Sequence, residues 1–514
     1  MKTSGWQSLA FLMLAPLAVQ AAPPEVTPEK LKAALPALDK LVEQTLQKTG
    51  VPGVAIAVVH RDQVVHLKGF GVRAAGRPEL VDADTVFQIA SMSKPMATTV
   101  LARLVGDKVI RWDDRVIDHL PEFRMYDPWV TRELTLRDCL CHRSGLPEQA
   151  GDWLEDIGYE RDAILHRLRF LKPASSFRSR YAYTNFGFTA AAVAGAKAAG
   201  KPWEDLCAEQ LYRPLGMTAT SSRYADYAAA KNRVLIHVRV DGKWTAKNIR
   251  QPDAQAPAGG VSSTARDLAQ WMRLQLAGGA WNGKPLVDAK ALAETHQPQI
   301  VSGYHPETRQ EALYALGWGI SRDEQGRLYW KHSGAFFLGI RTEVALLPAE
   351  GLGIITLSNA APTGVPEGIN ASFFDLVLHG KLRQDWITLW NDRFEQFVQM
   401  SLGAETNYAK PSASPSPALP AATYVGRYAN DYFGAVEVVE QQGALQLRLG
   451  PKPLTFPLRH YDRDVFVYQP TGESAGGPSG VTFTVGPQRQ ASRVVIECLN
   501  GNGQGAFERM PLVK

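Results

Sequence analysis

The chain has 514 residues, of which 45% are hydrophobic and 21% charged, a composition typical of globular and not of disordered proteins. Its length exceeds that of one ordinary domain. The formal net charge is +5, or +4 after subtraction of the one charge of Lys2, and basic runs are missing from the sequence. The charge of the chain therefore gives no electrostatic reason to expect nucleic-acid binding.

Residues 1–21 have the features of a secretory signal peptide: one lysine, an apolar stretch over residues 9–19, and Val19-Gln20-Ala21 as a cleavage site with small residues. The apolar stretch is too short to span a bilayer, and no cysteine near the cleavage site would allow lipid attachment. We therefore expect a periplasmic or secreted protein without an integral membrane segment.

The cysteine content is low, which indicates no disulfide framework. Two of the four cysteines lie two residues apart in a predicted helix and face different ways. An oxidising compartment permits pairing, so the sequence leaves open the pairing of Cys139, Cys141, Cys207 and Cys498.

The first predicted elements of the mature chain are a helix over residues 28–50 and a β-hairpin around Arg61-Asp62-Gln63. Helical patterns dominate from residue 91 to about 216, and strand patterns return over residues 314–359. The strand patterns thus lie before and after the helical patterns, so both ends of this stretch are expected to build one antiparallel sheet. Helices segregated from such a sheet predict an α+β fold with a cleft between the sheet and the helical region.

Ser91-Met92-Ser93-Lys94 opens a predicted helix and places a hydroxyl and an amine on one face within one turn. A lysine with a lowered pKa can take the proton of a serine hydroxyl and make it a nucleophile. About one S-x-x-K is expected by chance in a chain of this length, so the motif indicates a catalytic site only where further catalytic motifs accompany it. Pro95 lacks an N–H, so we expect a distorted first turn.

Two later segments supply such companions. Tyr183 and Asn185 lie two residues apart in an aromatic-rich turn that leads into a helix of small residues. His332-Ser333-Gly334 lies in a predicted strand, where glycine permits close approach of another molecule to the backbone. Each residue has a structural alternative: a half-buried core tyrosine, a turn-forming asparagine and a strand histidine bonded to backbone.

The motifs S-x-x-K, H-x-S-G-L-P, Y-x-N, P-L-G-M, G-G-V-S-S-T and H-x-G occur in this order. The order resembles that of the penicillin-recognising serine hydrolases, in the branch of class C β-lactamases, DD-peptidases, D-aminopeptidases and related esterases, over roughly residues 35–390. The resemblance implies a β-lactamase/transpeptidase-like fold, an antiparallel sheet flanked by helices with a helical subdomain. The H-x-S-G-L-P segment, residues 142–147, is typical of a scaffolding turn.

The same resemblance implies that Ser91 is the acylated nucleophile, Lys94 its proton partner and Tyr183 a second acid/base group. The backbone N–H groups of Ser91 and Ala335 would form the oxyanion hole. The substrate-binding residues that it implies are Asn185, His332, Ser333 and Gly334. It implies a small-molecule or peptide substrate. No pair of histidines with a carboxylate shows metal-ligand spacing, so we expect no metal, and acylation and deacylation of a serine require no cofactor.

Two departures from the β-lactamase pattern bear on the substrate. β-Lactamases of this branch carry lysine where this chain has His332, and Lys331 should point to the other face of the strand. No S-D-N tripeptide is present, which argues against the class A arrangement. We therefore expect hydrolysis of D-amino-acid-containing peptides or amides; β-lactamase or carboxylesterase activity and a weakly catalytic penicillin- or peptidoglycan-binding sensor are the alternatives.

A competing motif, G-x-S-x-G, occurs at residues 472–476 and is the nucleophile elbow of α/β-hydrolases. An elbow needs a helix after it and a histidine later in the chain. Here a glycine-rich turn and a strand pattern follow, and no histidine follows Ser474. The sequence therefore rejects Ser474 as the nucleophile.

We expect four segments: the signal peptide at 1–21, a β-lactamase-like serine hydrolase domain at 22–400, a linker rich in Pro, Ser and Ala at 401–422, and a small all-β barrel or sandwich at 423–514. Seven short strand patterns in the last segment resemble the lipocalin-like module of some family members. A further hypothesis gives this module the main function, as an interaction or assembly unit, and homo-oligomerisation through it stays open.

Overall fold

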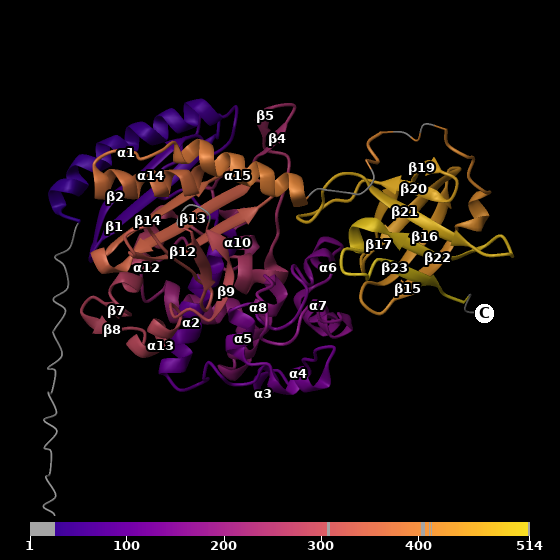
Figure 1. The fold of residues 1–514 in the computed structure, drawn as a ribbon, viewed down its shortest axis with the longest axis horizontal. Coiled ribbons are helices and arrows are strands. Elements are labelled where there is room, and N and C mark those ends of the chain that lie inside the picture. The colour runs from indigo at the N-terminus through magenta and orange to yellow at the C-terminus, as the bar shows by residue number, and fades with distance from the viewer. Residues whose placement is uncertain (1–25, 306–308, 402–406, 411, 413, 512–514) are drawn as a thin grey trace, which may run out of the picture.

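The computed structural model describes residues 26–305, 309–401, 407–410, 412 and 414–511 (Figure 1). The predicted signal peptide and part of the predicted linker lie outside these residues. Within them, no helix has the length and apolar character needed to cross a membrane.

The larger part of the chain is built on an antiparallel sheet of eight strands in the order β2-β1-β14-β13-β12-β11-β10-β9. Both chain ends of this part contribute strands, so the predicted α+β class and the N-terminal hairpin are confirmed. The strands are β1 (Gly53–His60), β2 (Gln63–Gly71), β9 (Ile300–His305), β10 (Gln310–Tyr314), β11 (Gly319–Arg322), β12 (Leu328–Phe336), β13 (Ile340–Leu347) and β14 (Leu352–Ser358).

One face of the sheet is covered by α1 (Pro28–Thr49), α14 (Val365–His379) and α15 (Trp386–Ser401) (Figure 1). The Thr27 hydroxyl caps α1 by accepting from the Lys30 N–H, and Gly50 ends it at φ +67°. The helix predicted over residues 28–50 is therefore confirmed, and its apolar face is buried at Leu31, Leu38 and Val42.

The other face carries α12 (Ala265–Leu276) and the helical region. Its further helices are α2 (Ser93–Gly106), α3 (Val116–His119), α4 (Pro128–Glu133), α5 (Leu136–Leu140), α6 (Asp152–Asp156), α7 (Arg161–Arg167), α8 (Asn185–Ala198), α9 (Trp203–Cys207), α10 (Tyr224–Ala229), α11 (Ala256–Gly259) and α13 (Ala289–Glu294). Short strand pairs connect them: β3 (Phe87–Gln88) with β6 (Ser262–Ser263), β4 (Val238–Val240) with β5 (Lys243–Thr245), and β7 (Ala280–Trp281) with β8 (Lys284–Pro285).

Helices α2 and α8 form the centre of this region, and small residues let them pack closely. Every residue of α8 from Phe186 to Ala196 is buried. A Cβ at Gly195 would lie 2.5 Å from Leu101 Cδ2 of α2, so the missing side chain lets the two helices pack closely without a shift of Leu101. Because α2 carries Lys94 and α8 begins at Asn185, this packing fixes two predicted site residues relative to each other.

The C-terminal domain is a nine-stranded antiparallel sheet that curls into a nearly closed barrel, in the order β18-β17-β16-β15-β23-β22-β21-β20-β19 (Figure 1). The predicted all-β module is confirmed, but β19 and β23, each four residues long, are two strands more than the seven predicted. The strands are β15 (Gly426–Asn430), β16 (Gly434–Gln441), β17 (Ala444–Leu449), β18 (Leu454–Pro457), β19 (Arg459–Asp462), β20 (Val465–Tyr468), β21 (Ser479–Val485), β22 (Ala491–Ile496) and β23 (Ala506–Arg509). All four cysteines are free.

The barrel docks on α6, α7 and the segment between them (Figure 1). The Gly151 N–H donates to the Tyr432 hydroxyl at 2.9 Å, and the Tyr159 hydroxyl donates to the Phe433 carbonyl at 2.8 Å. Tyr432 and Phe433 are themselves buried, and one hydrophobic cluster continues from the helical region into the barrel. The two parts therefore share a packed interface.

We predict that Gly450→Ala disrupts this interface. Gly450 has φ +84°, and a Cβ there would lie 1.8 Å from the Ile157 carbonyl oxygen. Gly443→Ala is the matched control, because Gly443 has φ +78° but open space around it. Both variants lose the ~1 kcal/mol of a left-handed alanine, and Gly450→Ala should lose at least ~2 kcal/mol more from the steric overlap. Urea denaturation measures both, and equal losses would contradict the docked arrangement.

Candidate active site

Ser91 lies in a 3₁₀ turn, Ala90–Met92, that leads into α2. The α-helix itself begins at Ser93, so the expected distortion of the first turn is found, and Ser91 is outside the regular helix. Ala90 has φ +48°, in a region that alanine rarely occupies. Backbone strain next to a candidate nucleophile is typical of functional sites.

Lys94 is fully buried, and its amine has three neutral acceptors around it. The Nζ atom lies 3.2 Å from Ser91 Oγ, 2.8 Å from Asn185 Oδ1 and 3.0 Å from the Ala258 carbonyl oxygen. Burial lowers the pKa of Lys94 to about 7, with nearby Asp152 acting in the opposite direction. Near neutral pH a large fraction of the amine is therefore unprotonated and able to take the Ser91 proton.

Tyr183 approaches Ser91 from the wall of the cleft that the helical region forms. Its hydroxyl donates to Ser91 Oγ at 2.8 Å, and burial raises the pKa of Tyr183, so the phenol stays protonated. The Lys94 Nζ atom lies 4.5 Å from the centre of the Tyr183 ring. The serine oxygen is thus held between an amine and a phenol.

His142, from the predicted scaffolding turn, packs against Tyr183. The two ring centres are 4.5 Å apart, and His142 Nδ1 accepts the Thr184 N–H at 3.2 Å. Burial lowers the pKa of His142 well below its ordinary value, so this imidazole is neutral. The contact supports its interpretation as a structural residue that orients the tyrosine.

Asn185 is the first residue of α8, and its two amide atoms have different partners. Its oxygen accepts from Lys94, and its Nδ2 donates to Asp152 Oδ2 at 3.0 Å. Burial raises the pKa of Asp152 well above its ordinary range. Asp152 was not predicted from the sequence, because no motif marks it; it reaches the site only through the position of α6.

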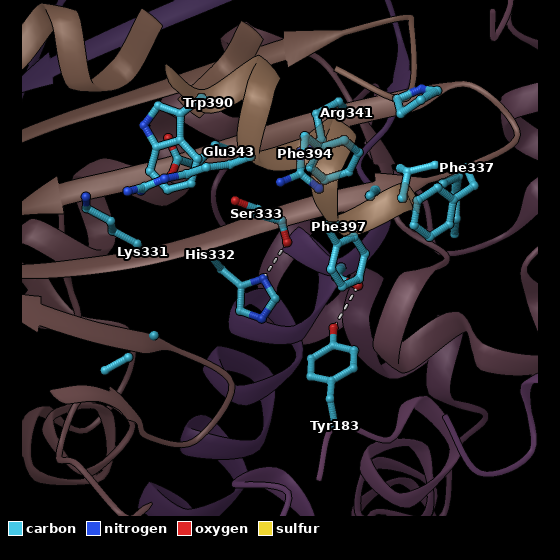
Figure 2. Close-up of a pocket in the computed structure, with 18 of the residues that line it drawn as sticks. Tyr183, Lys331, His332, Ser333, Phe337, Arg341, Glu343, Trp390, Phe394 and Phe397 are labelled. Atoms are coloured by element: carbon cyan, nitrogen blue, oxygen red, sulfur yellow. Dashed lines mark hydrogen bonds between the residues drawn. The ribbon is translucent and has the colours of Figure 1, made fainter. Parts of the chain in front are cut away.

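Strand β12 forms the second wall. A Cβ at Gly334 would lie 2.2 Å from the Ile89 carbonyl oxygen, so glycine lets the strand lie directly against the turn that carries Ser91. His332 and Lys331 leave β12 on opposite sides, as expected (Figure 2). Lys331 therefore does not replace the lysine of the β-lactamase pattern.

Both nitrogens of His332 have hydrogen-bonding neighbours. Its Nε2 lies 2.9 Å from the Tyr314 hydroxyl, and its Nδ1 lies 2.7 Å from the Ser333 carbonyl oxygen. Burial, with a smaller contribution from Lys94, lowers the pKa of His332 to about 3. The imidazole is therefore neutral at physiological pH, and Tyr314 is a partner that no sequence motif marks.

These residues meet in a cleft of about 1750 Å³, larger than a pocket for a drug-sized ligand. Among the predicted residues, those that line it are Ser91, Tyr183, Asn185, His332, Ser333 and Ala335. Its outer part carries the Phe337 and Phe394 rings, stacked with centres 6.2 Å apart (Figure 2). No group of three or more His, Cys, Asp or Glu side chains in the described ranges is arranged to hold a metal ion.

Comparisons with known proteins match the two parts of the chain separately. The beta-lactamase family matches residues 38–376, and a domain of unknown function, DUF3471, matches residues 410–507. The larger part, which contains Ser91, Lys94 and Tyr183, is thus the part similar to beta-lactamases.

Individual relatives extend this likeness. Unguisins hydrolase ungD' of Aspergillus campestris is 26% identical over 486 residues, covering 89% of this chain and 88% of that protein. The D-alanyl-D-alanine-carboxypeptidase/endopeptidase AmpH of Escherichia coli is 26% identical over 364 residues, covering 68% of this chain and 91% of AmpH. The octameric penicillin-binding protein homologue from Pyrococcus abyssi has a TM-score of 0.60 at 17% identity, covering 90% of this chain and 98% of that chain, which shows a common fold.

We predict that the rate at which Ser91 reacts with a fluorophosphonate rises with pH up to about 7 and levels off above it. The reason is that the neutral form of Lys94 accumulates over that range. Intact-mass measurement at a series of pH values gives the rate. Asn185→Asp places a carboxylate beside the amine and should raise its pKa, which moves the rise to higher pH. A rate independent of pH would contradict the role given to this amine.

Proposed function

The chain belongs to the beta-lactamase family of serine hydrolases, and we propose that it acts through an acyl-enzyme on Ser91. The observation that carries the proposal is the position of Ser91 Oγ, which is hydrogen-bonded both to Lys94 Nζ and to the Tyr183 hydroxyl. This arrangement supplies a base next to the hydroxyl and a second proton donor on the cleft side.

In this mechanism Ser91 Oγ attacks the substrate carbonyl carbon while its proton passes to Lys94 Nζ. The resulting oxyanion accepts from the backbone N–H groups of Ser91 and Ala335, and removing one such donor typically costs ~3–4 kcal/mol of transition-state stabilisation. Lys94 and Tyr183 return the proton to the leaving group. The same pair takes a proton from a water molecule, which attacks the acyl carbon. The bond from that carbon to Ser91 Oγ then breaks, and the pair returns the proton to Oγ, which releases the acid and free Ser91.

We propose D-amino-acid-containing peptides or amides as substrates. A neutral His332 offers no positive charge to a carboxylate at the place where β-lactamases of this branch carry lysine. The size of the cleft supports peptides rather than small esters. The similarity to AmpH, a D-alanyl-D-alanine-carboxypeptidase/endopeptidase, favours the same class.

We also propose secretion, on the sequence of residues 1–21 alone. Domain limits at 22–400, 401–422 and 423–514 and association of chains through the C-terminal module remain predictions.

The first test of this proposal is covalent labelling. Exposure to a fluorophosphonate and to a penicillin should each add one adduct to the protein, and Ser91→Ala should remove both. Ser492→Ala, at an exposed serine of the barrel, is the control that should keep them. Intact-mass measurement with peptide mapping reads the result, and an adduct on Ser474 would contradict the proposal.

The second test ranks substrates. Among D-amino-acid amides, p-nitrophenyl esters and nitrocefin, we predict the highest kcat/KM for the amides. Tyr183→Phe should lower kcat for them by ~10²–10⁴, the usual contribution of a positioned acid/base group, with the fold kept. A highest value for nitrocefin would favour a β-lactamase, whereas a stable penicillin adduct without turnover would favour a sensor.

A further inference from the structure

The G-x-S-x-G segment rejected as a nucleophile elbow occupies a definite place in the structure. Residues 472–476 form the turn between β20 and β21 of the barrel, and they line the same cleft as Ser91. Gly472 has φ +114°, and a Cβ there would lie 2.4 Å from Asp156 Cγ. The glycine of the motif therefore permits close contact with the hydrolase part.

Glu473 reaches from this turn to the end of β12. Its carboxylate accepts the Phe337 N–H at 2.5 Å and lies 3.5 Å from the Leu338 nitrogen. These two residues directly follow the strand that carries Ala335. The Arg250 Nε atom lies 3.8 Å from the same carboxylate, and the side chain of Glu473 is only 18% exposed.

The backbone of the same turn binds the opposite wall of the cleft. The Glu473 and Ser474 N–H groups donate to the two carboxylate oxygens of Asp156 at 2.8 and 2.7 Å. Asp156 ends α6, the helix whose Asp152 accepts from the Asn185 amide. One turn of the barrel thus contacts both the wall that holds Asn185 and the wall that holds Ala335.

The barrel is also docked by contacts that do not involve this carboxylate. The contacts of Tyr432 and Phe433 with Gly151 and Tyr159 already join the two parts. Burying a carboxylate costs free energy that an apolar contact would not cost. A role in the cleft explains why a charged residue stands at this position.

We propose that the C-terminal domain completes the active site, with Glu473 as a positioning residue that holds the end of β12, and with it the Ala335 N–H, in place. The inference rests on the proposed function, because it assumes that Ser91 is acylated and that the Ala335 N–H meets the oxyanion. Without Glu473, the N–H groups of Phe337 and Leu338 lose their acceptor and the end of the strand is less constrained.

The test compares Glu473→Ala and Glu473→Gln with Glu440→Gln, a substitution of an exposed glutamate on β16 of the same barrel. Two probes read the site: the rate of fluorophosphonate labelling of Ser91, and kcat and KM for p-nitrophenyl acetate. Thermal unfolding of each variant checks that it is folded at the assay temperature.

We expect Glu473→Ala to lower the labelling rate and kcat by ~10–100-fold, the effect of a small displacement at a reacting centre, with little change in KM. Glu473→Gln keeps an acceptor for the Phe337 N–H and should fall between Glu473→Ala and the unchanged Glu440→Gln. Equal kcat in all three variants, or a loss in Glu473→Ala only in proportion to its unfolded fraction, would overturn the proposal. If Ser91→Ala is labelled as fast as the native protein, the proposed function fails instead.

Discussion

The reactivity of the candidate active site depends on the burial of one amine, that of Lys94. Lys94 lies in the centre of the helical region with amide, carbonyl and hydroxyl oxygens around it, and among the residues that the structure describes no carboxylate forms an ion pair with its Nζ atom. A fully buried ammonium without a directly bonded counter-ion is costly, so the equilibrium moves toward the neutral amine. The same burial that lowers the pKa of Lys94 thus makes Ser91 reactive.

Several parts of the fold exclude water from this amine and orient it toward Ser91. The close packing of α2 and α8 places Asn185 over Lys94, and the carbonyl of Ala258 in α11 closes a third side. Asp152 fixes the orientation of the Asn185 amide by accepting from its nitrogen. The nearest carboxylate therefore acts on the amine through a neutral amide, which positions Lys94 without holding it fully protonated.

The sequence could predict the reacting groups because their chemistry needs fixed residue types at fixed spacings, as in the S-x-x-K of Ser91 and the Y-x-N of Tyr183. It also predicted the sheet, the first helix and the barrel, whose patterns are periodic. Asp152, Tyr314 and Glu473 could not be predicted, because each acts through contacts with residues distant in the sequence that only tertiary packing creates. The G-x-S-x-G segment shows the same limit: its glycine serves domain docking, which no local pattern reveals.

The most direct test of this account is the titration of the Lys94 amine itself. NMR of protein labelled with ¹³C at lysine Cε, with the signal assigned by its loss in Lys94→Arg, follows the protonation of Nζ independently of any substrate. A buried, largely neutral Lys94 should titrate with a midpoint near pH 7. A midpoint near the ordinary lysine value of 10.5 would show a charged amine beside Ser91 and would contradict it.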